Sequence, residues 1–183
     1  MEDRVAIIDL GTNTFLLLIA ERAKGSYQII HQHRIASKIG LGGINGGVIT
    51  PEAVERAILA LKEFRTTMDA WKVNRSFAYG TSAIRNAKNR LEFIHQIKTE
   101  THIEVKIISG EEEAELICLG VRQAVSLGKD KALIVDIGGG SVECIIANAT
   151  DIFWKRSFEI FPADVARQFQ NSASRKSGTD CPE

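Results

Sequence analysis

The chain has 183 residues, enough for one medium-sized domain or for one domain and part of another. Hydrophobic residues make up 44% of it and charged residues 25%, a composition that excludes a disordered protein and is typical of a soluble globular one. Basic and acidic residues number 23 each, but this neutrality excludes little, because clustered basic residues can still bind a polyanion.

Cysteine usage and hydropathy bear on the cellular location. The three cysteines follow no disulfide-framework or zinc spacing. The chain starts on an apolar run without the leader of a signal peptide, and no apolar stretch reaches the ~18 residues of a membrane span. We therefore expect a cytoplasmic protein that does not contact a membrane. We also expect that its partners include no nucleic acid polymer.

The first half of the chain predicts three strands and a helix. Apolar runs over residues 4–22 predict two strands, separated by a turn at residues 11–13, and residues 26–39 predict a third strand. Thr50 and Pro51 have the residue types of a helix cap and a first helical position. Apolar residues at near-helical spacing then predict an amphipathic helix to about residue 71.

The second half predicts two helices and further strands. Residues 76–80 and 103–109 are strand-like, and residues 87–101 are helical in their spacing. Ser109, followed by three glutamates, predicts a helix start, and the helix should run to about residue 127. Residues 131–160 then predict a strand, a glycine turn, a second strand, another turn and a third strand.

One strand–turn–strand unit occurs twice. The segments AIIDLGTNTFLLLIA and LIVDIGGGSVECIIA share an apolar run, an aspartate, a glycine-containing turn and a second apolar run, and Asp9 matches Asp136. Such a repeat predicts two similar domains that face each other. A cleft between them, with one turn from each domain, would suit a phosphate group.

Both turns are candidate phosphate-binding loops, although either could be an ordinary hairpin turn. A phosphate-binding loop needs backbone amides that side chains do not obstruct. Asp9 and Asp136, which precede the turns, could bind a divalent cation or could cap their own turns. The candidate loop residues are Gly11, Thr12, Asn13 and Thr14 in the first loop and Gly138, Gly139, Gly140 and Ser141 in the second.

Two further features have both a structural and a catalytic interpretation. Acidic residues in the first turn of a helix stabilise it, so the segment SGEEEAEL could be no more than a helix start. One of its carboxylates could instead reach a bound water as a general base. Likewise, Arg85 in the segment YGTSAIRNAKN could bind a phosphate or could lie on a solvated helix surface.

Taken together, four segments resemble the exopolyphosphatase/guanosine pentaphosphate phosphohydrolase (Ppx/GppA) family. They are AIIDLGTNTFLLLIA, YGTSAIRNAKN, IISGEEEAELICLGV and LIVDIGGGSVECIIA, in that order, and the resemblance covers residues 4–160. It implies an α/β fold of the actin-like ATPase (RNase H-like) type with a duplicated second domain. It also implies Mg²⁺ as cofactor.

The resemblance assigns roles to individual residues. It makes Glu113 the general base, directs Arg85 to the substrate phosphates, and associates Asp136 and Glu143 with the metal and the catalytic water. Asp9 belongs to the first loop and is a further candidate metal ligand. Two departures from the family pattern are small: threonines replace serines in the first loop, and Val142 replaces a threonine in the second.

The resemblance also implies a domain division and a function. We expect an N-terminal domain over residues 1–128, the opening strands of an only partly present second domain over 129–160, and a divergent or disordered tail over 161–183. The incomplete second sheet should expose an edge and an apolar face, which predicts association, such as a homodimer. The expected reaction is hydrolysis of the terminal phosphoanhydride of inorganic polyphosphate or guanosine pentaphosphate. The alternatives are an actin-like kinase or ATPase, and a non-catalytic fragment that binds phosphate or a partner.

Overall fold

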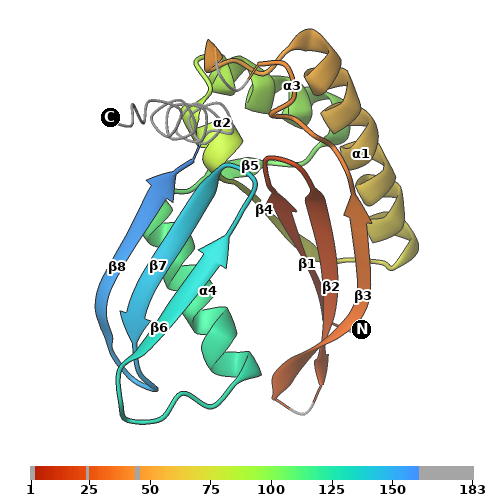
Figure 1. Cartoon of the computed structure of the whole chain (residues 1–183). Helices are drawn as coiled ribbons and strands as arrows, with labels where there is room; N and C mark the ends of the chain where they lie inside the picture. The colour runs from red at the N-terminus through yellow and green to blue at the C-terminus, as the bar shows by residue number, and fades with distance from the viewer. Residues whose placement is uncertain (1–2, 24, 44–45, 161–183) are drawn as a thin grey trace, which may run out of the picture.

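A computed structural model of the chain describes residues 3–23, 25–43 and 46–160, and it contains two β-sheets that lie side by side (Figure 1). The first sheet has the strand order β3-β2-β1-β4-β5. Strands β1, β2 and β3 are antiparallel neighbours, whereas β4 and β5 run parallel to β1. The bounds are β1 Arg4–Leu10, β2 Phe15–Ala23, β3 Ser26–Ile35, β4 Arg75–Gly80 and β5 Val105–Ile107.

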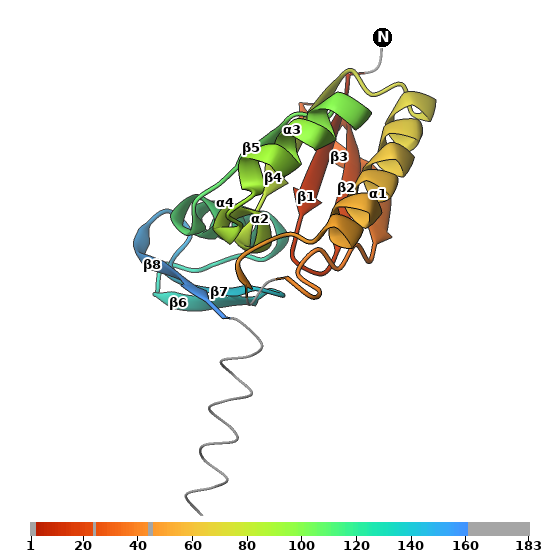
Figure 2. The same ribbon diagram turned by 90° about the horizontal axis from the view of Figure 1, so that it is seen from above.

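Two helices pack on one face of this sheet, α1 (Pro51–Ala70) and α3 (Arg90–Thr101) (Figure 2). The predicted start of α1 is confirmed, because the Thr50 side chain accepts a hydrogen bond from the backbone amide of Ala53 at 3.3 Å. Alternating apolar residues of the strands and one side of each helix form the main core. Its largest fully buried side chains include Phe15, Phe64, Phe93, Leu10, Leu17 and Leu61.

The sequence prediction was wrong at several element boundaries in this half of the chain. The third strand ends at Ile35 instead of residue 39, because a turn follows in which Lys38 has a left-handed φ of 47°. The helix predicted from residue 87 begins at Arg90, because Ala87 is extended. A short helix that the sequence did not predict, α2 (Ser82–Asn86), precedes it. The strand predicted over 103–109 is only β5.

The second sheet contains β6 (Ala132–Ile137), β7 (Ser141–Ala147) and β8 (Ile152–Glu159), in that order and antiparallel, as predicted. Helix α4 (Gly110–Ala124) covers one of its faces and ends at Ala124, short of the predicted residue 127, because Val125 is extended. The predicted division at residue 128 groups α4 with the first domain, but its buried side contacts the second sheet. The buried cluster there consists of Ala114, Cys118, Ile134, Ile145 and Ala147.

The other face of the second sheet carries exposed apolar side chains. Leu133, Val135 and Ile137 alternate along β6, and Ile137 is 77% exposed. Trp154 and Phe158 continue this face on β8, two strands away. The exposed face agrees with the sequence expectation, while association through it stays a prediction. The predicted tail over 161–183 lies outside the described residues. Among the helices of the described part, none is long and apolar enough to cross a membrane.

Candidate active site

The two candidate phosphate loops, residues 11–14 and 138–141, meet at the ends of the two sheets. A Cβ atom on Gly139 would lie 2.5 Å from Nδ2 of Asn13. A Cβ atom on Gly140 would lie 2.6 Å from Oγ1 of Thr12 and 2.7 Å from Oγ of Ser82. The glycines of the second loop therefore allow a close approach that any larger residue would obstruct. The structure thus brings together two loops that are far apart in the sequence.

Each loop is also a tight turn in its own right. The amide of Gly138 donates to the carbonyl of Ser141 at 2.9 Å, which closes the turn between β6 and β7. In the first loop, a Cβ atom on Gly11 would lie 2.9 Å from the carbonyl oxygen of Thr14. The ordinary interpretation of these segments as turns is therefore correct. It is compatible with phosphate binding, because such turns leave backbone amides unobstructed.

Two aspartates precede the loops and influence each other. Asp9 lies near the end of β1, and Asp136 lies near the end of β6. Neighbouring protein atoms displace part of the water around the Asp9 carboxylate, and this desolvation, together with repulsion by Asp136, raises the pKa of Asp9 to about 6. The two matching aspartates of the repeat are therefore within electrostatic range of each other.

Glu143 lies beside Asp136 in the second sheet. The two residues are cross-strand partners on β6 and β7, and Glu143 is paired with Ser157 of β8 on its other side. The Ser157 hydroxyl donates to Glu143 at 2.7 Å, and Glu143 is only 1% exposed. Cross-strand partners project from the same face of a sheet, so these three side chains form one polar row.

The acidic residues fit Mg²⁺ only in part. Within the described residues, no group of three or more His, Cys, Asp or Glu side chains is arranged to hold a metal ion. Mg²⁺ is commonly held, however, by one or two carboxylates together with waters and substrate phosphates. Repulsion by Asp136 contributes to the raised pKa of Asp9, so these two carboxylates lie within electrostatic range of each other. They are the number of carboxylates that such a site uses, and Glu143 is the cross-strand neighbour of Asp136.

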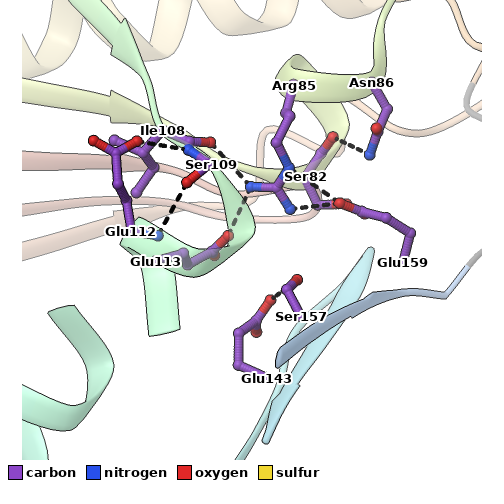
Figure 3. A network of polar contacts seen from close by, with 10 residues as sticks. All are labelled: Ser82, Arg85, Asn86, Ile108, Ser109, Glu112, Glu113, Glu143, Ser157 and Glu159. Carbon is purple, nitrogen blue, oxygen red and sulfur yellow. Dashed lines mark hydrogen bonds and ion pairs between the residues drawn. The ribbon is translucent and has the colours of Figure 1, made fainter. Parts of the chain in front are cut away.

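Two neighbouring glutamates at the start of α4 have different contacts, Glu112 with the helix cap and Glu113 with Arg85. Ser109 accepts from the amide of Glu112 at 3.1 Å, and the Glu112 side chain accepts from the Ser109 amide at 2.9 Å. This capping box is the structural interpretation of the motif, and it holds for Glu112. Glu113, one position further, points away from the cap and toward Arg85, at 2.9 Å (Figure 3).

Glu113 has the proton affinity expected of a general base. Burial raises the pKa of Glu113 to about 7, against the hydrogen bond from Arg85, and repulsion from Glu143 and Asp9 adds to the increase. A carboxylate that titrates near neutrality can take a proton from water and later release it. Glu113 is thus within electrostatic range of one carboxylate from each sheet, Asp9 of the first and Glu143 of the second.

Arg85 projects from α2, and all three nitrogens of its guanidinium have protein acceptors (Figure 3). Nη1 donates to the carbonyl of Ile108 at 3.2 Å and to Glu113 at 2.9 Å. Nε and Nη2 donate to one carboxylate oxygen of Glu159, at 3.0 and 2.6 Å. Arg85 therefore lies at the site and not on a solvated helix surface.

Glu159 is a site residue that the sequence did not reveal. Its second carboxylate oxygen accepts from the hydroxyl of Ser82. Partial burial acts to raise the pKa of Glu159, but hydrogen bonds from Ser82 and Arg85 outweigh it and lower the pKa. The signal in the sequence is the alternation of Ser157 and Glu159 along β8, because alternate residues project from the same face of a sheet.

Comparison with known proteins agrees with this geometry. Residues 18–174 match the model of the Ppx/GppA phosphatase family. An exopolyphosphatase structure from Cytophaga hutchinsonii is 44% identical with a TM-score of 0.87, over 91% of this chain and 54% of that one. A structure of the Aquifex aeolicus PPX-GPPA enzyme is 31% identical with a TM-score of 0.80, over 92% and 56%. A bifunctional 3-dehydroquinate synthase/phosphatase from Fusobacterium nucleatum is 33% identical over 172 residues, which are 90% of this chain and 26% of that protein.

The comparisons confirm the resemblance that the four motifs carry, and they confirm the α/β actin-like fold class. The chain spans about a quarter of the Fusobacterium nucleatum protein and just over half of the two solved structures. The roles of the individual site residues stay predictions.

Proposed function

The chain belongs to the Ppx/GppA phosphatase family, and from this premise we propose that it hydrolyses the terminal phosphoanhydride of inorganic polyphosphate or guanosine pentaphosphate. The observation that carries the proposal is the Glu113–Arg85 pair at 2.9 Å, next to the meeting point of the two loops. It combines a carboxylate whose burial raises its pKa to about 7 with a cation suited to phosphate.

In the proposed reaction, the side chains of this chain position the phosphates and move one proton. Amides of the two loops would contact phosphate oxygens, and Arg85 would neutralise charge on the terminal group. Glu113 would accept a proton from the attacking water, and orthophosphate would leave. Positioning and charge neutralisation account for most of the catalysis of phosphoryl transfer, so the loops and Arg85 should matter as much as the base.

Mg²⁺ would be held by Asp9 and Asp136, with Glu143 beside them. When bound, it would supply positive charge for the phosphate oxygens. Asp9, with a pKa raised to about 6, should then lose its proton more readily, because a cation favours the charged carboxylate.

Phosphate release from polyphosphate by the Glu113→Gln variant tests the base. The variant keeps the size of the side chain but cannot accept a proton, so we expect phosphate release to be abolished. Glu111→Gln is the matched control, because Glu111 is an exposed carboxylate in the same helical turn. An unchanged rate in the Glu113 variant would refute the role of Glu113.

The substrate is tested by offering polyphosphate and guanosine pentaphosphate separately to the 183-residue chain. The full-length Cytophaga hutchinsonii relative serves as a reference, since this chain covers 54% of it. Release from one substrate alone would decide between them. If this chain binds a substrate but releases no phosphate, while the reference protein does release phosphate, the result would favour the non-catalytic alternative for this chain.

A further inference from the structure

Glu159 occupies the more accessible side of Arg85. The side chain of Glu159 is 30% exposed, whereas that of Glu113, on the other side, is 17% exposed. Glu159 lies at the end of β8, and Glu113 is fixed in the first turn of α4. A ligand that approaches Arg85 from solvent therefore meets the carboxylate of Glu159 before it meets that of Glu113.

The donors around Glu159 are those that a phosphate group would use. Nε and Nη2 of Arg85 and the hydroxyl of Ser82 all donate to its two carboxylate oxygens. A guanidinium edge and a hydroxyl bind phosphate oxygens in the same way. Because Nη1 already donates to Ile108 and Glu113, the edge that Glu159 holds is the one an incoming phosphate can take.

Glu159 also joins the two halves of the site. Arg85 and Ser82 belong to α2 beside the first sheet, whereas Glu159 is on the second sheet, 74 residues after Arg85. Gly110 at the start of α4 packs so closely on β8 that a Cβ atom there would lie 2.4 Å from Cβ of Ser157. This packing holds the end of β8 against the site.

We propose that Glu159 is an internal anion that a substrate phosphate displaces from Arg85 and Ser82, and that it thereby lowers the phosphate affinity of the site and sets its selectivity. The proposal rests on the proposed function, because it takes Arg85 as a phosphate ligand. After displacement, Ile108 and Glu113 still hold Nη1, so the guanidinium keeps its orientation. A multiply charged terminal phosphate replaces the carboxylate favourably, whereas a singly charged anion gains little.

The size of the effect follows from competition for one position. If Glu159 accepts from Arg85 and Ser82 for about nine-tenths of the time, the apparent affinity for phosphate is about tenfold lower than it would be if these donors were free. Removal of the competing charge should therefore strengthen binding by about tenfold, which is the opposite of what loss of a supporting contact would do.

The test is the dissociation constant of inorganic tripolyphosphate for the 183-residue chain, measured by isothermal titration calorimetry. We expect Glu159→Gln to bind about tenfold more tightly than wild type. Glu115→Gln is the matched control: Glu115 pairs with Lys155 and so also joins α4 to β8, and its loss changes the net charge equally. Tighter binding by both variants to the same extent would mean a general charge effect and would overturn the proposal.

Two more variants separate the possible failures. Glu159→Asp keeps the charge but shortens the reach to Arg85 and Ser82, so it should also bind more tightly, and wild-type affinity in this variant would count against displacement.

Arg85→Gln should lose binding. If it does while Glu159→Gln binds like wild type or more weakly, the displacement proposal fails and the proposed function stands. If Arg85→Gln binds like wild type, Arg85 is not a phosphate ligand and both fail. Absence of binding by both wild type and Glu159→Gln would also overturn the proposal.

Discussion

Replacement of Glu113 by glutamine should stabilise the fold at neutral and alkaline pH, although it should abolish activity. Glu113 has a pKa raised from 4.5 to about 7, because burial and nearby carboxylates disfavour its charge. The folded protein therefore binds a proton here more tightly than the unfolded chain does. Consequently the contribution of Glu113 to stability is fully present below about pH 4.5 and is lost as the pH rises through about 7.

The magnitude follows from the same shift. At 1.36 kcal/mol for each pKa unit, the cost of the ionised form would be about 3 kcal/mol. Solvent screening of a side chain that is 17% exposed should reduce this cost to roughly 2 kcal/mol. A glutamine amide resembles the protonated carboxyl, so the Glu113→Gln variant should be about 2 kcal/mol more stable than wild type at pH 8.

The assay is urea denaturation of both proteins at pH 4 and pH 8, with EDTA present so that no metal ion neutralises the site. The difference in free energy of unfolding should be near zero at pH 4 and favour the variant at pH 8. Glu111→Gln, in the same turn, is the control for a general loss of charge. The reasoning would be refuted if the Glu113 variant were no more stable than wild type at pH 8. It would also be refuted if the difference in free energy of unfolding were the same at pH 4 and pH 8.

Four other predictions concern two glycines, the helix cap and the metal. Gly140→Ala should destabilise the protein by about 1–3 kcal/mol in thermal denaturation, because its Cβ atom would lie 2.6 Å from Oγ1 of Thr12. Gly120→Ala should instead stabilise it by about 1 kcal/mol, because it lies inside α4 with open space around it. Ser109→Ala should cost about 1 kcal/mol by the same measurement, through loss of the capping box, and an unchanged stability would contradict that contribution. Mg²⁺ should raise the melting temperature in the presence of tripolyphosphate, and an equal increase in the Asp136→Asn variant would exclude Asp136 as a ligand.

Local sequence signals predicted the elements of the fold well. Thr50 and Ser109 were identifiable as caps, because a cap depends on residues that are adjacent in the chain. The repeated unit predicted that Asp9 and Asp136 occupy matching positions, since the same pattern folds in the same way twice. One error was the missed helix α2, whose five-residue length gives no usable periodicity. The other errors were element ends, at β3, α3, β5 and α4.

The partners within the site were harder to predict, because they depend on packing between distant segments. Arg85 and Glu159 are 74 residues apart, and no local pattern indicates that the end of β8 lies against α2. For the same reason, spacing alone could not decide which glutamate at the start of α4 faces the site. Glu112 and Glu113 differ because the helix turns only Glu113 toward Arg85.

The two apolar clusters of the described residues differ greatly in size, and this difference has a consequence for hydrogen exchange. The cluster under α4 is formed by Ala114, Cys118, Ile134, Ile145 and Ala147, whereas that of the first sheet includes three buried phenylalanines. Segments with less buried apolar surface open more often, so amides of β6–β8 should exchange faster than those of β1 and β2. Glu113 is at the start of α4 and Arg85 is on α2, so an opening of α4 and β6–β8 would separate the two residues. Mutations of the residues buried under α4 should therefore change how often the Glu113–Arg85 pair is formed, without contacting any substrate.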